Sequence, residues 1–237
     1  MKILWYCLYN VFLYPAAFMC ASFLSLFQSK LREGMIGRML SMNVLKKYFK
    51  TFDRKKKVFW FHAASLGEFN QIKTIIEEIQ QQKYNSINII SFSSPSGMNN
   101  VYDEAIDLKF YLPFDFPWVV KKVLEIVQPS KLVFSSYDLW PNLLWYSHSK
   151  HIHTSIVSAK MKKNSIKNKL IFKNFYQFLY GSISAIYTIT NKDKMRYEKL
   201  IGSAATTRIS VMGNPRYDMV YKASKHFILK DSAALVI

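Results

Sequence analysis

The sequence predicts an α/β fold: a Rossmann-like, doubly wound parallel sheet preceded by an N-terminal membrane-anchor helix. Residues 3–27 contain no charged side chain. From residue 58 onward, short apolar runs alternate with amphipathic segments, a pattern typical of strands and helices that follow one another in a parallel sheet. The 237 residues are 50% apolar and 16% aromatic, which excludes a mostly disordered chain and leaves room for an anchor and one domain.

The first apolar stretch is long enough to cross a membrane as a helix. Residues 3–27 would span roughly 37 Å, against a hydrocarbon core of about 30 Å. Asn10 and Pro15 weaken the stretch, so a tilted helix or one that lies in the interface is an alternative. A cleaved signal peptide is another, but Lys2 alone would form its basic region and no small-residue cleavage site follows. We expect an anchor over residues 1–28, with aromatic residues that favour membrane interfaces: Trp5, Tyr6, Tyr9 and Tyr14.

Residues 29–57 are expected to form a basic juxtamembrane loop. Ten Lys or Arg side chains in this segment stand against two acidic ones, Glu33 and Asp53. By the positive-inside rule, the following domain lies in the cytoplasm, and the loop offers a surface to anionic lipid head groups. A charge run is also commonly just a solvated face, and the two interpretations are compatible. The formal net charge, 33 − 15 = +18, predicts an anionic partner.

The soluble part consists of predicted strands separated by helices. Residues 58–61 are a short apolar run of the kind buried in a parallel sheet, and residues 68–82 place large apolar side chains on one helical face. Pro117 starts a helix over 117–127, and Pro129 follows its end. Residues 58–220 are therefore predicted to form one domain with right-handed crossovers. Further strands are expected at 87–92, 110–112, 131–135, 154–157, 183–189 and 209–212, and further helices after a turn at 93–97 and at 141–149, 170–180 and 192–201.

The first strand-to-helix corner, residues 62–68, carries the strongest candidate site residue. Ligands bind at the carboxyl ends of strands in such sheets. Glu68 is a candidate general base, because the positive end of the helix would keep it ionised. Ser65 and Glu68 also have the spacing of a capping box, and from spacing alone capping is favoured over catalysis. His62 is interpreted as a core histidine rather than an acid or base.

The remaining corners carry polar and basic side chains with two interpretations each. Ser96 belongs to a serine-rich turn that can bind phosphate or serve as a plain loop. Asp138 can cap the helix that Pro141 helps to start, which is favoured, or bind a ligand. Lys160 begins a run of six lysines within 14 positions, suited to phosphate or membrane lipid. Arg216 can clamp a phosphate or a carboxylate.

Several chemistries are excluded by the sequence pattern. The sequence has no GxGxxG, P-loop, HExxH or GxSxG motif. Cys7 and Cys20 both lie in the apolar stretch, which excludes a disulfide framework and a cysteine-based zinc site. His148, His151 and His153 have no carboxylates at ligand spacing. We therefore expect no metal, no cofactor and, because no nucleic-acid-binding pattern accompanies the basic residues, no nucleic-acid partner.

In this order, the corners resemble those of 3-deoxy-D-manno-octulosonic acid (Kdo) transferases of Gram-negative lipopolysaccharide synthesis. Residues 62–68, HAASLGE, match the family's HxxSxGE corner, the most specific of the signals. The resemblance extends from the anchor to about Asp218. Residues 32–38 are similar to the family's basic loop, and residues 94–97 are similar to its TPTG turn. Residues 111–115 match its YLPxD motif, residues 139–142 match its ELWPN motif without the acid, and residues 213–218 are similar to its GNxKFD motif.

The resemblance implies the N-terminal half of a GT-B glycosyltransferase, which binds the lipid acceptor while a second domain binds the CMP-activated sugar. It implies transfer of Kdo from CMP-Kdo to a phosphorylated lipid A precursor (lipid IVA) at the cytoplasmic face of the cell inner membrane, with inversion. Glu68 would be the general base, and Arg216 would stabilise transition-state charge. The acceptor-binding positions that it implies are Ser65, Gly67, Ser96, Asp138 and Lys160.

Three departures from the family pattern affect this expectation. Ser136 stands where the family has the first of two carboxylates, and Lys160 replaces an arginine. Residues 221–237 are expected to begin the linker to a second domain, so the half that binds CMP-Kdo is expected to be absent. The alternative is a catalytically inactive or truncated membrane-bound domain of the same family that binds lipid or phosphate.

Overall fold

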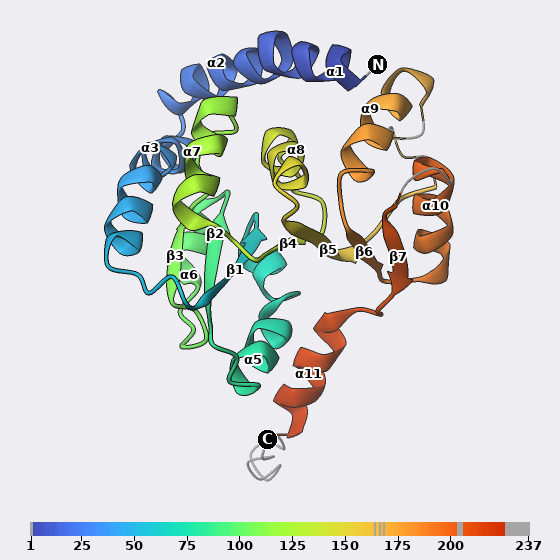
Figure 1. Cartoon of the computed structure of the whole chain (residues 1–237). Helices are drawn as coiled ribbons and strands as arrows, with labels where there is room; N and C mark the ends of the chain where they lie inside the picture. The colour runs from blue at the N-terminus through green and yellow to red at the C-terminus, as the bar shows by residue number, and fades with distance from the viewer. Residues whose placement is uncertain (1, 164, 166, 168, 203–205, 226–237) are drawn as a thin grey trace, which may run out of the picture.

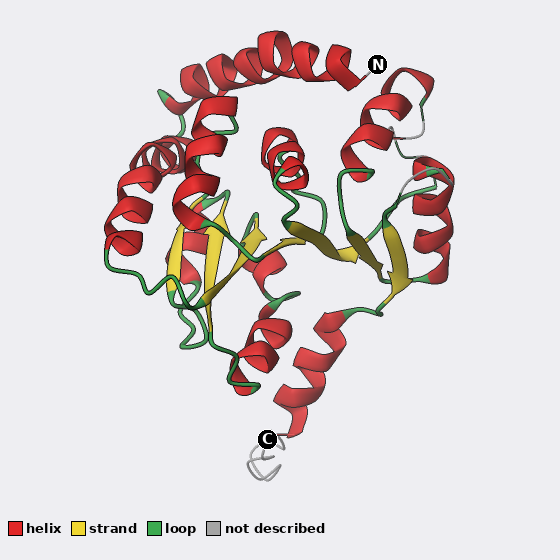
Figure 2. Ribbon diagram, viewed as in Figure 1, coloured by secondary structure: helices red, strands yellow, loops and turns green. Residues whose placement is uncertain are grey.

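Parallel strands form the centre of the molecule, and helices cover both faces (Figures 1 and 2). The computed structural model describes residues 2–163, 165, 167, 169–202 and 206–225. Within them, the strand order is β3-β2-β1-β4-β5-β6-β7, so the predicted doubly wound fold is confirmed. The strands are β1 (Lys57–Ala63), β2 (Ser86–Phe92), β3 (Leu108–Tyr111), β4 (Lys131–Ser135), β5 (His153–Ala159), β6 (Ala185–Thr188) and β7 (Arg208–Val211).

The helices of the domain follow the predicted order with two local differences. The helix expected over 68–82 is broken into α4 and α5, because the chain between them turns to bury Ile72 and the side chain of Gln71. A helix that was not expected, α11, begins at Pro215 and packs against α5. The helices are α4 (Leu66–Phe69), α5 (Lys73–Gln81), α6 (Pro95–Asn100), α7 (Pro117–Val127), α8 (Pro141–Ser149), α9 (Leu170–Tyr180), α10 (Asn191–Ile201) and α11 (Pro215–Lys225).

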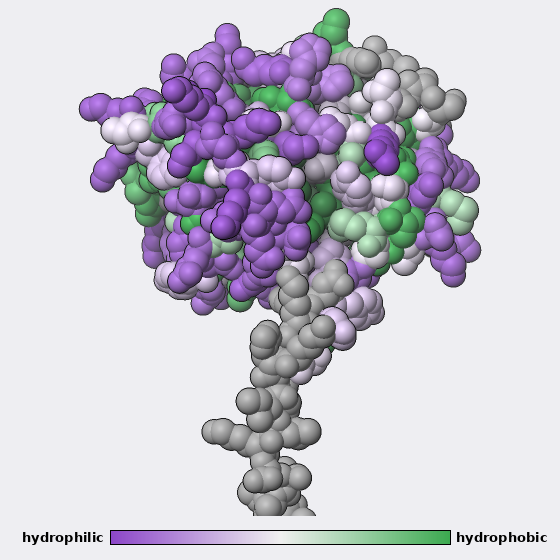
Figure 3. All heavy atoms as spheres, turned by 60° about the horizontal axis from the view of Figure 1, so that its bottom comes forward, coloured by the Kyte–Doolittle hydropathy of each residue, from purple (hydrophilic) through white to green (hydrophobic). Residues whose placement is uncertain are grey.

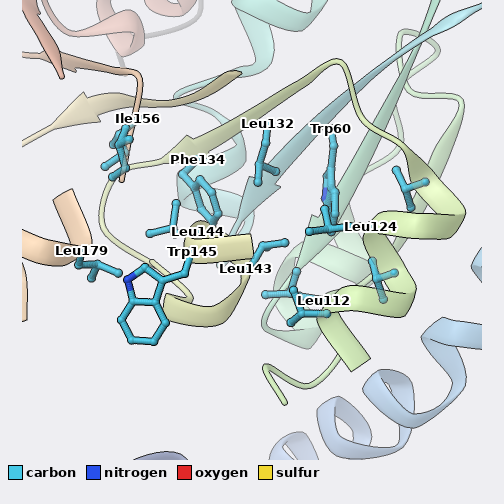
Figure 4. Close-up of a cluster of buried hydrophobic side chains, with 14 of the residues drawn as sticks. Trp60, Leu112, Leu124, Leu132, Phe134, Leu143, Leu144, Trp145, Ile156 and Leu179 are labelled. Atoms are coloured by element: carbon cyan, nitrogen blue, oxygen red, sulfur yellow. The ribbon is translucent and has the colours of Figure 1, made fainter. Parts of the chain in front are cut away.

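Side chains of β1 alternate between the two faces of the sheet, as the period of a strand requires. Val58 and Trp60 join the larger core, and Phe59 and Phe61 join the smaller one. In Figure 4 the larger core extends from Trp60 past the β4 side chains to α7, α8 and α9. Helices α4 and α5 and the turn between them contribute to the smaller core, chiefly through Phe69, Ile72 and Ile76. The sheet is therefore buried on both sides.

The segment expected as a basic loop, residues 29–57, is mostly helix α3 (Ser29–Lys50), so that expectation was wrong. Met35, Leu45 and Phe49 are buried, and Met42 packs against the core. These positions recur at spacings of three, four and seven residues, which is the pattern of an amphipathic helix. This apolar spacing was missed in the sequence because more weight was given to the many charged residues of the segment. The buried stripe holds α3 against β3 and α7.

The N-terminal apolar stretch is helical and lies across the domain rather than apart from it (Figure 1). It comprises α1 (Lys2–Leu8), a π-helical turn (Tyr9–Leu13) and α2 (Tyr14–Ser25). The π-helical turn, which is wider than an α-helical turn, precedes Pro15, and Pro15 has no N–H to donate a regular α-helical hydrogen bond. Ile3–Ser25 has a mean hydropathy of 1.5 and the length to cross a membrane, properties that buried core helices and signal sequences also have.

Polar contacts fix this N-terminal helix to the domain. The Tyr9 hydroxyl donates to Asp115 Oδ2 at 2.9 Å, and the Tyr14 hydroxyl accepts from the Asp115 N–H at 2.6 Å. The amides of Asn10 and Asn142 form two reciprocal hydrogen bonds. The opposite side of the helix exposes apolar side chains, including Phe12 and Phe23. The face of the molecule in Figure 3, by contrast, is mainly hydrophilic.

We predict opposite effects of alanine at two glycines of α3. A Cβ at Gly37 would lie 2.1 Å from Tyr111 Cδ2, so Gly37→Ala is expected to lower the free energy of unfolding by about 1–3 kcal/mol. A Cβ at Gly34 would meet nothing closer than 3.9 Å, so Gly34→Ala is expected to raise it by about 0.4–1 kcal/mol. Urea titrations in mild detergent measure both. Equal changes in the free energy of unfolding for Gly37→Ala and Gly34→Ala would contradict the close packing of α3 on Tyr111.

Candidate active site at the carboxyl ends of the strands

The candidate site lies where the strand order reverses, between β1 and β4. At such a switch point, the connections leave the sheet in opposite directions and open a crevice. Three corners are tied together there. Ala64 O accepts hydrogen bonds from the N–H and hydroxyl of Ser94, at 3.0 and 2.7 Å. Ser135 Oγ donates to Glu68 O at 2.8 Å, which fixes α4 to the end of β4.

Glu68 is held at the first corner without forming a capping box. Its Oε2 accepts from the N–H of Ala64 at 2.7 Å, and the Ser65 side chain makes no capping hydrogen bond. Burial raises the pKa of Glu68 to about 7, and the Asp138 carboxylate adds to the rise. The Ala64 N–H and the Arg216 guanidinium oppose it. A carboxyl group with this pKa can both accept and release a proton near neutral pH.

Asp138 is bonded to a buried histidine. His62 Nε2 lies 3.0 Å from Asp138 Oδ2, and His62 Nδ1 lies 2.9 Å from the Ser91 hydroxyl. The Ser93 hydroxyl also donates to Asp138. Burial alone would raise the pKa of Asp138, but the interactions with His62 and Ser93 lower it to about 2. Asp138 is therefore a fixed negative charge beside Glu68, and His62 is the core histidine that the sequence predicted.

The structure corrects the capping role favoured for Asp138. The N–H groups of Asn142 and Leu143, at the start of α8, donate to Asp115 instead, at 2.9 and 3.0 Å. Asp115 is fully buried, and the Tyr9 hydroxyl is the third donor to its carboxylate. Asp115, from the loop after β3, supplies the cap, and Asp138 instead bonds to His62 and lines the cavity. Sequence spacing could not reveal this, since the two segments are far apart in the chain.

Helix α11 brings Arg216 back to the first corner. Its Nη2 donates to Gly67 O at 3.1 Å, and a Cβ added at Gly67 would lie 3.9 Å from both Arg216 Nη2 and Ser65 Oγ. The guanidinium is exposed and close enough to Glu68 to lower its pKa. Four predicted site residues, from corners about 150 positions apart, thus converge: Ser65, Gly67, Glu68 and Arg216.

A large cavity lies at the second and third corners, and the second corner is tied to the first through Ser94 and Ala64. The cavity has a volume of about 1360 Å³ and lies between the N-terminal helix, α3 and α9. Ser96 and Asp138 line it, and the hydroxyls of Ser94 and Ser96 lie 3.0 Å apart at its edge. Lys160 is exposed and does not line the cavity, and its carbonyl accepts from the Tyr197 hydroxyl at 3.1 Å. Lys160 follows the last residue of β5, at the carboxyl edge of the sheet, and no hydrogen bond joins it to another predicted site residue in the described part of the chain.

Two further residues bear on the site. Arg38 is largely buried; its guanidinium donates to Leu112 O and Ser93 O and lies over the Trp140 ring, 4.6 Å from the centroid. It was missed because its segment was expected to be a loop, although the apolar spacing around it indicates a buried helical face. Ser136, at the position of the missing family carboxylate, is buried, and its hydroxyl donates to Gln71 Oε1 at 2.7 Å.

Within the described part of the chain, no group of three or more His, Cys, Asp or Glu side chains is placed to hold an ion. The chemistry available at this corner is proton transfer by Glu68 and charge stabilisation by arginine and backbone N–H groups.

A doubly wound parallel sheet with a cavity and a titratable carboxylate at its switch point defines a Rossmann-like domain of the GT-B type. The UDP-GlcNAc 2-epimerase of Methanocaldococcus jannaschii has a similar fold, with a TM-score of 0.51 and 14% identity over 72% of this chain and 48% of that one. The profile of the 3-deoxy-D-manno-octulosonic-acid transferase (kdotransferase) family matches residues 42–219. The chain belongs to this family of glycosyltransferases, as its motifs predicted.

Two curated relatives carry the same name, 3-deoxy-D-manno-octulosonic acid transferase. The protein of Haemophilus influenzae is 28% identical over 163 residues, which cover 68% of this chain and 38% of the relative. The protein of Chlamydophila psittaci is 26% identical over 160 residues, which cover 66% of this chain and 36% of the relative. The chain thus spans less than two fifths of the length of these relatives.

Proposed function

We propose that this domain binds the acceptor in a Kdo transfer from CMP-Kdo to a phosphorylated lipid A precursor. The observation that carries the proposal is the position of Glu68, a carboxyl group with a pKa of about 7 at the family's most specific motif. Burial and the fixed charge of Asp138 keep its proton affinity high enough for a general base. The neighbouring cavity has the apolar walls that a lipid acceptor needs.

In this mechanism Glu68 takes the proton of an acceptor hydroxyl as that oxygen attacks the anomeric carbon of Kdo. The bond from this carbon to the CMP phosphate oxygen breaks, and its electron pair leaves with CMP. Attack opposite to the leaving group inverts the anomeric centre. Arg216, 3.1 Å from Gly67 O, is assigned to the negative charge of the departing phosphate. Ser65, Gly67, Ser96 and Asp138 are assigned to the acceptor, whereas Lys160, which does not line the cavity, is left without a role in this mechanism.

We place the domain at the cytoplasmic face of the inner membrane. The exposed apolar side of the N-terminal helix provides the attachment, and basic side chains of α3 lie next to it in the chain. The relatives' greater length supports assignment of the CMP-Kdo donor mainly to residues beyond this domain. This arrangement keeps the acceptor, which is a lipid, close to the bilayer.

The alternative is a membrane-bound domain that binds lipid or phosphate without catalysis. The observation that favours it is Ser136, whose hydroxyl is engaged by Gln71 where the family has a carboxylate. Membranes that express this chain alone, or joined to the C-terminal half of the Haemophilus influenzae relative, separate the two in a CMP-Kdo transfer assay. Transfer by the joined protein supports the enzyme. Lipid binding without transfer supports the alternative.

The pKa of Glu68 predicts a pH profile for the joined protein. Since the base acts only when ionised, transfer should rise about tenfold per pH unit below pH 7 and level off above it. Folding stability should change in the opposite direction. The folded pKa lies above the ordinary 4.5, so the contribution of Glu68 to stability is complete below pH 4.5 and lost as the pH rises through about 7. A flat rate between pH 5.5 and 8.5 would contradict the assignment.

A further inference from the structure

The cavity under the N-terminal helix is larger and more apolar than a sugar or a single phosphate requires. Its volume of about 1360 Å³ exceeds the roughly 300–1,000 Å³ of ordinary small-molecule pockets. Apolar side chains of the N-terminal helix form one wall, and aromatic residues of α9 form another. Among these wall residues are Trp5, Leu8, Phe18, Phe172 and Phe175. Such walls are suited to hydrocarbon.

One part of the cavity lining is polar and includes a carboxylate whose charge acts on the candidate base. Ser93, Ser96 and Asp138 line this part, and Asp138 is close enough to Glu68 to raise its pKa. The cavity therefore combines apolar walls under the N-terminal helix with a polar part at Ser93, Ser96 and Asp138, and the charge of Asp138 acts on Glu68. A molecule that fills it has a hydrocarbon part and a polar part.

The charges of the lining indicate the sign of that polar part. Lys30, Arg38 and Lys167 line the cavity, and among the described residues none of them has a carboxylate within 4 Å. The acidic residues of the lining have other partners. Glu33 accepts from Asn99 and Tyr111, and Asp138 accepts from His62 and Ser93.

Lys167 is the most informative of the three basic residues. Its Nζ hydrogen-bonds to the Tyr180 hydroxyl and lies 5.5 and 5.0 Å from the ring centroids of Tyr176 and Tyr180. Burial lowers its pKa to about 8. A half-buried ammonium with aromatic neighbours and no carboxylate is stabilised by an anion that enters the cavity.

We propose that the cavity holds the acyl part of the phosphorylated lipid acceptor, with an anionic group of its head on Lys167 and a sugar hydroxyl at the Glu68 corner. This inference rests on the proposed function and adds the place of the hydrocarbon. The N-terminal helix is then part of the acceptor site as well as an attachment to the membrane. The charge complementarity selects an anionic amphiphile over a neutral one.

Matched substitutions on the N-terminal helix test this inference. Ala17 and Ala21 line the cavity, whereas Ala16, on the same helix, does not. Ala17→Trp and Ala21→Trp fill the space, so each should weaken binding at least about tenfold, and Ala16→Trp should leave it unchanged. Lys167→Gln should weaken binding about tenfold, and Lys163→Gln, an exposed lysine away from the cavity, should not.

The measurement is equilibrium binding of radiolabelled lipid A precursor to the full chain in phosphatidylcholine nanodiscs, with phosphatidylglycerol as competitor. Thermal melts show which variants are folded. If the tryptophan variants do not fold, the binding measured for Lys167→Gln decides the test. Binding unchanged in Ala17→Trp, Ala21→Trp and Lys167→Gln overturns the inference while transfer by the joined protein upholds the function. Equal displacement by phosphatidylglycerol also overturns it, in favour of a bilayer-lipid site. Absence of both binding and transfer in the wild type overturns the proposed function as well.

Discussion

Glu68→Gln is expected to reduce sugar transfer by about 100- to 10,000-fold in the joined protein, the range that a general base contributes. Glutamine has nearly the same shape, and its amide oxygen can still accept from the N–H of Ala64, which now lies 2.7 Å from Glu68 Oε2. It has no basic oxygen to take the acceptor proton. The fold should therefore persist while transfer is lost.

The control for this variant is Glu78→Gln on α5, which removes an exposed carboxylate away from the site. Its transfer rate should equal that of the wild type. Initial rates with CMP-Kdo, together with thermal melts, compare the two variants. If Glu68→Gln retains transfer, or loses more stability than the roughly 0.5–2 kcal/mol of a helix cap, the carboxylate has a structural role and the mechanism is wrong.

The largest effect on stability is expected from Asp115→Ala. The carboxylate accepts from Asn142 N, Leu143 N and the Tyr9 hydroxyl, at 2.9, 3.0 and 2.9 Å. Alanine would leave the two N–H groups at the start of α8 buried without a partner, at about 1–3 kcal/mol each. We expect the free energy of unfolding to fall by about 3 kcal/mol. The N-terminal helix should also become more accessible to protease, because it loses the bond from Tyr9.

Asp53→Ala provides the matched control, because the Asp53 carboxylate lies in an exposed turn, where the one hydrogen bond it accepts from a described residue comes from the N–H of Lys55. It should change stability by less than about 0.5 kcal/mol. Urea titration in mild detergent and limited proteolysis compare the two variants. A fall of under 1 kcal/mol for Asp115→Ala would show that water replaces the carboxylate at α8 and that the N-terminal helix is held in another way.

Local pattern was sufficient for most of the fold. Helices α7, α8 and α9 and strand β4 begin and end where the sequence predicts, since Pro117 and Pro141 start helices and apolar runs mark the strands. Helix α3 was missed because its charges were given more weight than its apolar spacing. The break between α4 and α5 was missed for a different reason. It depends on the partner of Gln71, which is Ser136 from another corner.

The candidate site was predictable residue by residue but not as an arrangement. The motif pointed to Glu68, and the alternation of strands and helices placed both Glu68 and Asp138 at strand-to-helix corners. Their roles depend on partners that spacing does not reveal: Ala64 for Glu68, and His62 for Asp138. The N-terminal helix shows the same limit. Its apolar composition predicted an anchor, but its hydrogen bonds to Asp115 and Asn142 appear only in the folded chain.

The sequence by itself determined the fold class, the family and the residues at each corner, because periodicity and motif are properties of neighbouring residues. The tertiary structure alone decided which carboxylate caps α8, which one stays ionised, and what surrounds the cavity under the N-terminal helix. Those outcomes depend on burial and on contacts between segments distant in the chain. Burial raises the pKa of Glu68 to about 7, while a buried histidine keeps Asp138 charged beside it.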